Sequence, residues 1–196
     1  ARRLRAAGSE VVAVVCNRVA TARSVHTLLN LEGEAVLLTG RIRPADRDAL
    51  LAEYLPRLEA GSRAEGRVPL FVVATQTIEV GADLDFDGLV SECAPLSALR
   101  QRAGRLNRLG ELATAPMVVV YQPRKDDKVY GEGAALGWTW LTKVATRKVV
   151  DFAPQSLGTL MAATPPHEEE APRTPLLLRS HLEVLASDTA RADLTP

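Results

Sequence analysis

The sequence is poor in the residues that build metal centres, disulfide frameworks and membrane spans. It has 196 residues, of which only two are Cys and three are His. Because His26, His167 and His181 show no metal-ligand spacing and none precedes an Asp, we expect no metal site within the chain. Cys16 and Cys93 lie far apart among apolar or small neighbours, which predicts reduced, buried thiols and a cytoplasmic protein. No apolar run approaches the roughly 20 residues of a bilayer-spanning helix, so we expect no membrane segment.

The sequence also lacks a surplus of either charge. Lys plus Arg and Asp plus Glu each number 24, so any nucleic-acid contact has to come from the local placement of basic residues. Aromatic residues make up 4% and hydrophobic residues 46% of the chain, a balance that favours α/β layers over an all-β sandwich. Residues 1–5 contain no Met and precede no signal-like apolar stretch, and we therefore expect a domain of a longer protein.

Short apolar runs alternate with helical patterns along the first 150 residues. The run 11–16 is continuous and β-branched, as in a strand that is buried on both faces. Further strands are expected at 35–39, 69–75, 88–92 and 117–121, and helices at about 18–30, 44–58, 97–108 and 130–147. This alternation predicts an α/β fold, a three-layer, doubly wound domain with a mainly parallel sheet over residues 1–150.

The residue composition changes near residue 151. Prolines recur from Pro154 to Pro175, with an acidic run at 168–170 between them. This pattern predicts an extended Pro-rich linker over residues 151–175. An apolar pattern then resumes, and we expect a partial C-terminal helical segment at 176–196.

The sequence has no complete phosphate-binding loop. Gly61 and Gly66 have the spacing of a Walker A loop, but Arg67 replaces its Lys and Val68 replaces its Ser or Thr. These glycines also precede an expected strand, whereas a phosphate-binding loop follows one. No Asp-Glu-x-Asp/His segment supplies a Walker B site. We therefore expect that the chain alone does not hold ATP and magnesium.

The segment 101–108 has the pattern Gln-x-x-Gly-Arg-x-x-Arg. As a helix it would place Gln101, Arg105 and Arg108 on one face, and Gly104 would let another backbone or a ligand approach closely. Two neighbouring guanidinium groups repel one another unless an anion binds them, and their forked donors match the oxygens of a triphosphate. The alternative is a basic helix face that is merely solvated.

Four motifs in order across residues 11–110 resemble those of the C-terminal RecA-like domain of superfamily-two helicases. They lie at 14–18, 38–47, 72–85 and 101–108. Within the superfamily, the run Ala-Thr-Gln-x-Ile-Glu-Val-Gly-Ala-Asp-Leu-Asp at 74–85 is similar to the CRISPR-associated helicase–nuclease of type I systems. The form of segment 38–47 and the tail 175–185 resemble the subtype once labelled U and now G.

The resemblance implies a role for each nucleotide-facing residue. Arg105 and Arg108 match the arginine fingers that reach the γ-phosphate on the first RecA-like domain. Gln101 matches the glutamine near the phosphates and the attacking water. Gly81 and Asp83 match positions that line the nucleotide.

The resemblance also implies nucleic-acid contacts. The matching residues are Asn17, Arg18, Thr39, Arg41 and Thr75. Most of these follow an expected strand, and ligands of open α/β sheets bind at the carboxyl ends of strands. Aromatic stacking platforms are absent from the motif region, so we expect backbone contact without base recognition.

Several alternatives stay open for single residues. Thr75 could be an ordinary cap and Asp83 a turn residue. Glu79 could form an internal ion pair with an arginine of the segment 101–108. Trp138 and Trp140 lie in a later helix, where core packing is the expected role.

The function that the resemblance implies is ATP-driven translocation on single-stranded DNA. ATP and magnesium would be held mainly by a first RecA-like domain that this chain does not contain. The isolated chain is therefore expected to be inactive. The further partners would be a nuclease domain and an RNA-guided CRISPR surveillance complex. Two alternatives remain, another superfamily-two motor (an RNA helicase or a restriction-type translocase) and a non-catalytic RecA-like interaction module.

Overall fold

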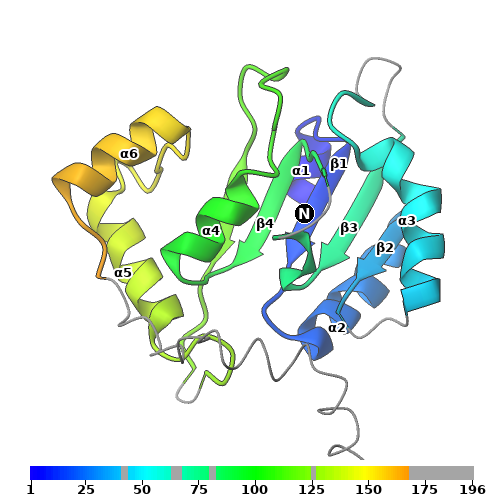
Figure 1. Ribbon diagram of the computed structural model, residues 1–196, viewed down its shortest axis with the longest axis horizontal. Coiled ribbons are helices and arrows are strands. Elements are labelled where there is room, and N and C mark those ends of the chain that lie inside the picture. Colours follow the sequence, from blue (N-terminus) through cyan, green and yellow to red (C-terminus); the bar gives the residue numbers. More distant parts are fainter. Residues whose placement is uncertain (41–43, 63–67, 80–82, 125–126, 168–196) are drawn as a thin grey trace, which may run out of the picture. The chain divides into compact units, whose positions relative to one another are not determined.

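The computed structural model describes residues 1–40, 44–62, 68–79, 83–124 and 127–167. The chain divides into the units Ala1–Pro166 and His167–Pro196, and the description below concerns the first. Its centre is a parallel sheet in the order β2-β3-β1-β4-β5 (Figure 1). The strands are β1 (Val11–Val15), β2 (Ala35–Leu38), β3 (Leu70–Ala74), β4 (Gly88–Glu92) and β5 (Met117–Val120). The expected α/β fold with a parallel sheet is confirmed.

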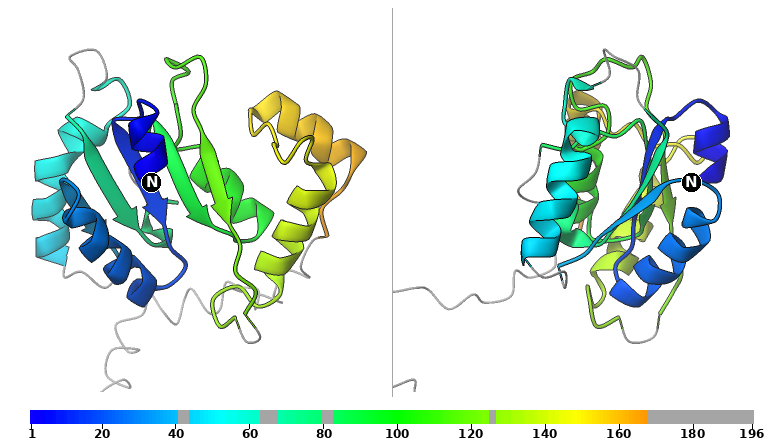
Figure 2. Two further views of the ribbon diagram at one scale, coloured as in Figure 1. Left: turned by 180° about the vertical axis from the view of Figure 1, so that it is seen from behind. Right: turned by 90° about the vertical axis from the view of Figure 1, so that its right-hand side faces the viewer.

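Helices cover both faces of the sheet. The helices are α1 (Arg2–Ala6), α2 (Val19–Asn30), α3 (Pro44–Leu58), α4 (Leu96–Ala103), α5 (Gly133–Val144) and α6 (Pro154–Ala163), with a 3-10 turn η2 (Gln76–Ile78). Figure 2 shows α1 and α2 on one face and α3 and α4 on the other. In the described residues no helix is both long and apolar enough to cross a bilayer.

The central strands are buried on both faces because their side chains alternate between two cores. Every residue of β1 and β3 is buried, as their β-branched runs predict for a parallel sheet. Val11, Ala13 and Val15 pack in the core on the α3 side with Leu58. Val12 and Val14 pack in the opposite core with residues of α2. Because the strands run in parallel, their carboxyl ends lie at one edge of the sheet.

A third core joins α4 to α5 and α6. Trp140 is buried, and its Nε1 donates to the carbonyl of Thr164 at 2.7 Å. Trp138 is half-buried and stacks on Tyr121 with 5.2 Å between the ring centroids. Both tryptophans belong to this core, as expected. A Cβ on Gly137 would lie 2.4 Å from the carbonyl oxygen of Ala94, so only glycine permits this approach of α5 to the start of α4.

The predicted linker 151–175 is wrong for its first half. Residues Pro154–Ala163 form α6, and Leu157 is buried in the third core. Pro154 stands in the first turn of the helix, where its missing N–H costs nothing because that group has no partner inside the helix. Proline therefore begins this helix, and the next prolines come only after it ends. The rest of the expected linker from 168 on, and the expected segment 176–196, lie outside the described residues.

Candidate functional site

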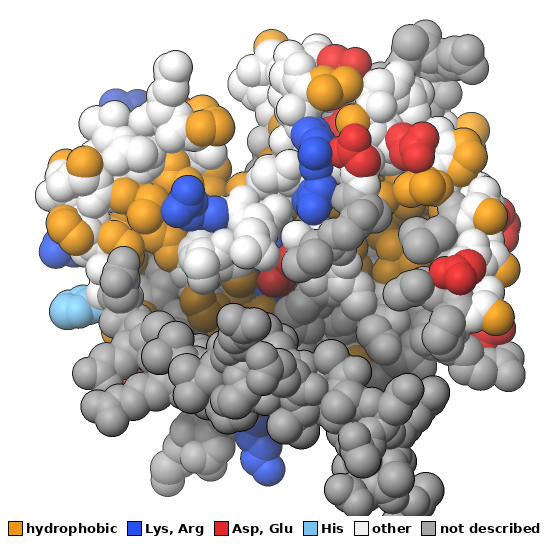
Figure 3. All heavy atoms as spheres, viewed as in Figure 1, with side chains coloured by type: hydrophobic (Ala, Val, Ile, Leu, Met, Phe, Trp, Pro, Cys, Tyr) orange, Lys and Arg blue, Asp and Glu red, His pale blue; other side chains and the backbone are white. Residues whose placement is uncertain are grey.

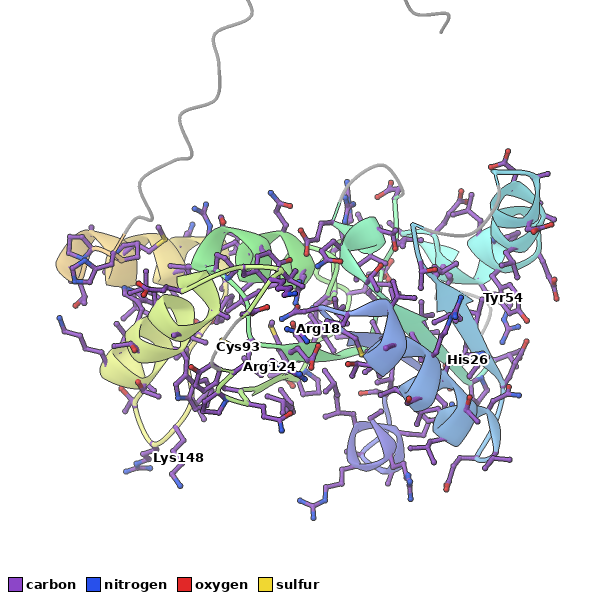
Figure 4. All side chains as sticks on the ribbon, turned by 90° about the horizontal axis from the view of Figure 1, so that it is seen from below. Arg18, His26, Tyr54, Cys93, Arg124 and Lys148 are labelled. Atoms are coloured by element: carbon purple, nitrogen blue, oxygen red, sulfur yellow. The ribbon has the colours of Figure 1, made fainter. Side chains whose placement is uncertain are left out.

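The carboxyl ends of the parallel strands gather polar residues at one edge of the sheet. Figure 4 views the molecule from that edge and shows Arg18, Cys93 and Arg124 close together. Helix α2 follows β1 on one face, whereas α4 follows the adjacent β4 on the other. Ligands of open α/β sheets bind at such a change of direction. A pocket lies here, and its lining includes Asn17, Arg18, Glu92, Cys93, Arg124 and Asp127.

Asn17 uses both ends of its side-chain amide inside the domain. Its Nδ2 donates to the carbonyl of Cys93 at 2.7 Å, and its Oδ1 accepts from Nη2 of Arg102 at 3.1 Å. Its backbone N–H donates to Oε2 of Glu92 at 2.6 Å. Asn17 therefore ties the loop after β1 to the loop after β4. Arg18 forms an ion pair with Asp127 at 3.5 Å and keeps 35% of its side chain exposed.

Thr39 and Thr75 lie side by side after the neighbouring strands β2 and β3. Both are buried, and the backbone N–H of Thr75 donates to the carbonyl of Leu38 at 3.1 Å. Thr75 stands at the cap position of η2, but its side chain forms no cap hydrogen bond, so an ordinary cap does not explain this residue. The two other expected site residues of this region, Arg41 and Gly81, lie outside the described residues.

The expected helix over 97–108 ends earlier, so Gln101, Arg105 and Arg108 do not share a helix face. Helix α4 ends at Ala103, and the chain then pairs with the segment before β4. The N–H of Phe86 donates to the carbonyl of Arg105, and the N–H of Asn107 donates to the carbonyl of Phe86, both at 2.9 Å. Asn107 turns the backbone to a φ of +47°, a conformation that asparagine tolerates. This pairing with Phe86 replaces the helical hydrogen bonds that the sequence pattern favoured.

Gly104 does not mark a close approach of another segment among the described residues. The nearest atoms to an added Cβ are the carbonyl oxygens of Arg100 and Gln101, both at 3.4 Å. These belong to α4 itself. No other described segment makes a close backbone contact at Gly104, and the approach of a ligand there stays a prediction.

Arg105 and Arg108 lie together in the turn after α4. Arg105 is half-buried, and its Nε and Nη2 donate to the carbonyls of Ile78 and Glu79 at 3.2 and 3.3 Å. Burial, and then the charge of Arg108, lower the pKa of Arg105 from its ordinary value, while Asp83 opposes the shift. Nε of Arg108 lies 2.8 Å from Oδ1 of Asp83. The structure thus brings Asp83 and both arginines together, with Gln101 exposed on the last turn of α4.

The sequence prediction missed Arg102, the most buried polar residue of this segment. Its side chain is 0% exposed and pairs with Glu79 at 2.9 Å, which identifies the internal ion pair that was one explanation for Glu79. Arg102 lies three and four residues after Leu99 and Ala98, both buried on the inner face of α4. That spacing is the signal that could have found it.

The charges of this region do not form one broad basic surface. On the face that carries α3 and α4, Figure 3 shows basic side chains beside acidic ones. The described residues contain no group of three or more His, Cys, Asp or Glu side chains that could hold a metal ion.

Comparison with known proteins places this arrangement in a family. The family described as CRISPR-associated nuclease/helicase Cas3, C-terminal, matches residues 8–111, more than half of the chain. The chain belongs to this family. The matched residues include β1 to β4 and the whole segment Gln101–Arg108. The expected likeness to the CRISPR-associated helicase–nuclease is confirmed, and its subtype stays a prediction.

Individual Cas3 proteins share both sequence and fold with the chain. The putative CRISPR-associated nuclease/helicase Cas3 of Methanocaldococcus jannaschii is 34% identical over 99 residues, which are 50% of this chain and 13% of that protein. A crystal structure of T. fusca Cas3-ATP has a TM-score of 0.64 at 25% identity, and the match covers 79% of this chain and 19% of that one.

A third Cas3-related match is a structure described as a CRISPR RNA-guided surveillance complex, pre-nicking. It has a TM-score of 0.55 at 28% identity and covers 67% of this chain and 18% of that one. The chain therefore spans only a small part of the Cas3 relatives that it matches.

Proposed function

We propose that this chain is the second RecA-like half of an ATP-driven DNA helicase or translocase in CRISPR interference, and that Arg105 and Arg108 are its arginine fingers. The observation that carries the proposal is the placement of both guanidinium groups in the turn after α4, beside Asp83. The family's description as a nuclease/helicase supports it.

The two fingers differ in how they are held. Arg105 is oriented by two backbone carbonyls. Among the described residues, Arg108 is held by an ion pair with Asp83 whose side chains are 39% and 62% exposed. Exposed pairs of this kind contribute little free energy. The γ-phosphate of ATP can therefore replace Asp83 on Arg108, and Asp83 then lies beside the nucleotide. Gln101, exposed one turn earlier, would face the phosphates and the attacking water.

ATP would bind between this chain and a first RecA-like domain. Magnesium, when bound, neutralises charge on the phosphates, and carboxylates of that other domain would hold it. This chain's contribution is positive charge, because forked guanidinium donors match the oxygens of the transferred phosphoryl group. The relative crystallised as Cas3-ATP supports ATP as the nucleotide.

Single-stranded DNA would run along the carboxyl edge of the sheet. Thr39 and Thr75 lie at the ends of neighbouring strands, and Arg18 projects from the start of α2. We assign phosphate contacts to these residues and to Arg41. Contacts to the DNA backbone carry no base information, which suits a motor that moves over any sequence. Asn17 would act on DNA binding indirectly, because it ties the loop after β1 to the loop after β4.

The partner in the cell would be an RNA-guided surveillance complex bound to DNA. The likeness to a chain of a surveillance complex supports this assignment. We also place a nuclease domain elsewhere in the full-length protein, and the family's description as a nuclease/helicase supports it.

The decisive test is Arg105→Ala in a full-length helicase that contains this chain. Loss of an arginine finger lowers phosphoryl transfer by about 10³- to 10⁵-fold, so ATP turnover measured by phosphate release should fall to near background with single-stranded DNA present. Arg100→Ala is the matched control, since Arg100 is an exposed arginine of α4, the helix that ends just before Arg105. An Arg105→Ala protein with wild-type turnover would refute the finger assignment. The isolated chain should hydrolyse no ATP.

A further inference from the structure

The buried side chain of Arg102 is a junction between the loops after β1 and β4 and the segment that holds Arg105. An arginine has five N–H donors, and each donor of Arg102 has a partner. Nε donates to Oε1 of Glu79, Nη1 to Oγ of Ser91 and the carbonyl of Glu92, and Nη2 to Oδ1 of Asn17 and the hydroxyl of Tyr130, at 2.8 to 3.1 Å. With 0% exposure, this guanidinium meets no ligand itself.

One side of the junction reaches the proposed fingers through Glu79. The carboxylate of Glu79 binds Arg102, while its backbone carbonyl accepts from Nη2 of Arg105 at 3.3 Å. One residue therefore holds both arginines. A displacement of the Arg102 guanidinium that pulls on the Glu79 carboxylate can therefore be passed to the carbonyl that orients Arg105.

The other side reaches the carboxyl edge through Asn17 and Glu92. Both residues line the pocket at that edge, and they are joined by the 2.6 Å hydrogen bond from the N–H of Asn17 to the Glu92 carboxylate. Arg102 binds Oδ1 of Asn17 and the carbonyl of Glu92. A ligand that shifts the loops after β1 and β4 therefore also shifts Arg102.

We infer that Arg102 is a positioning residue that couples occupancy of the carboxyl edge to the placement of Arg105. The inference rests on the proposed function, since it takes the ligand at the edge to be the single-stranded nucleic acid and Arg105 to be a finger. A planar guanidinium with every donor bonded transmits a displacement because none of its contacts can slide freely. The coupling is predicted to act on stimulation by nucleic acid and not on the chemistry of the unstimulated site.

Arg102→Lys in a full-length helicase that contains this chain separates coupling from catalysis. A Lys ammonium is a point charge without the arginine fork, so it can keep the pair with Glu79 while losing the bonds to Asn17 and Glu92. Steady-state ATP hydrolysis is measured with and without oligo-dT. We expect basal hydrolysis close to wild type and a stimulation ratio reduced by about fivefold or more, the lower end of ordinary allosteric couplings.

Tyr130→Phe is the second variant and guards against misfolding of the first. It removes only the hydroxyl that accepts from Nη2 of Arg102 and should reduce the stimulation ratio in the same direction by a smaller factor. Tyr54→Phe, in which the hydroxyl of another half-buried tyrosine is removed in α3, is its control and should stimulate normally.

The outcomes distinguish this inference from the proposed function. A folded Arg102→Lys protein with the wild-type stimulation ratio overturns the coupling role, and so does an equal loss of basal and stimulated rates. If Arg102→Lys does not fold, normal stimulation of Tyr130→Phe overturns it. A wild-type protein without ATP hydrolysis would instead refute the proposed function.

Discussion

The end of α4 and the turn that follows it place arginines in opposite surroundings. Arg102 is fully buried and uses every donor in bonds to four separate segments of the domain. Arg108, six residues later, keeps 39% of its side chain exposed and forms an ion pair with the exposed Asp83. The first arginine is part of the scaffold, and the second can exchange its partner for a ligand. Residue type alone does not separate these two roles, but burial does.

Replacement of Arg102 and Arg108 tests the difference between the two arginines most directly. Arg102→Met leaves the Glu79 carboxylate, which is 12% exposed, without its cation. Breaking a largely buried pair in this way costs about 3–5 kcal/mol. Arg108→Met removes an exposed pair, and its effect on the free energy of unfolding should be about 1 kcal/mol or less. Urea unfolding of the 196-residue chain measures both values. Equal losses would show that the two sites are held alike.

A neighbouring contact explains why the start of α4 is fixed. Gly137 of α5 packs on the carbonyl of Ala94, two residues before α4 begins. A Cβ at 2.4 Å from that oxygen forces the helix away, so Gly137→Ala should destabilise the chain by about 1–3 kcal/mol, as overpacking does.

Gly158 of α6 provides the matched control. An added Cβ there meets no atom within 4 Å, so Gly158→Ala should stabilise the chain by about 0.5–1 kcal/mol through helix propensity. Opposite signs for the two substitutions, in thermal or urea unfolding, would show that the α5 contact and not glycine content is what matters. Changes of the same sign in the free energy of unfolding would show that the contact of Gly137 with Ala94 does not fix the start of α4.

The strands and their parallel direction could be predicted from the sequence because they depend on local composition. The β-branched run 11–16 is buried on both faces, and strands of that kind occur in parallel sheets. Two local predictions failed where tertiary contacts compete with a pattern. The helix over 97–108 ends at Ala103 because the following backbone pairs with Phe86. The predicted linker contains α6 because Pro154 begins a helix.

The placement of the candidate site residues could be predicted only in part, because it too depends on tertiary contacts. The arginine pattern pointed to Arg105 and Arg108, and the structure brings them together with Asp83. Arg102 was missed because arginine is almost never fully buried unless it is paired, and its partners lie far away in the sequence. Asn17 has the expected position after β1, yet its amide faces inward. Side-chain direction at a strand end depends on the loops packed around it.

The thiol of Cys93 tests whether the buried side of α4 is closed to water. Burial raises the pKa of Cys93 from 9.0 to about 11, against smaller opposing effects of the Ala94 backbone and Arg102. Because the folded-state pKa is the higher one, the folded state keeps its proton while the unfolded chain loses it. The resulting stability is complete below about pH 9 and is lost as the pH rises toward about 11.

The free energy of unfolding, measured by urea titration, should therefore fall more steeply between about pH 8.5 and 10.5 for the wild type than for Cys93→Ala. Other titrating groups, including Cys16, cancel in that difference. Parallel curves would show that Cys93 titrates as an exposed thiol and that this side of α4 is open to water.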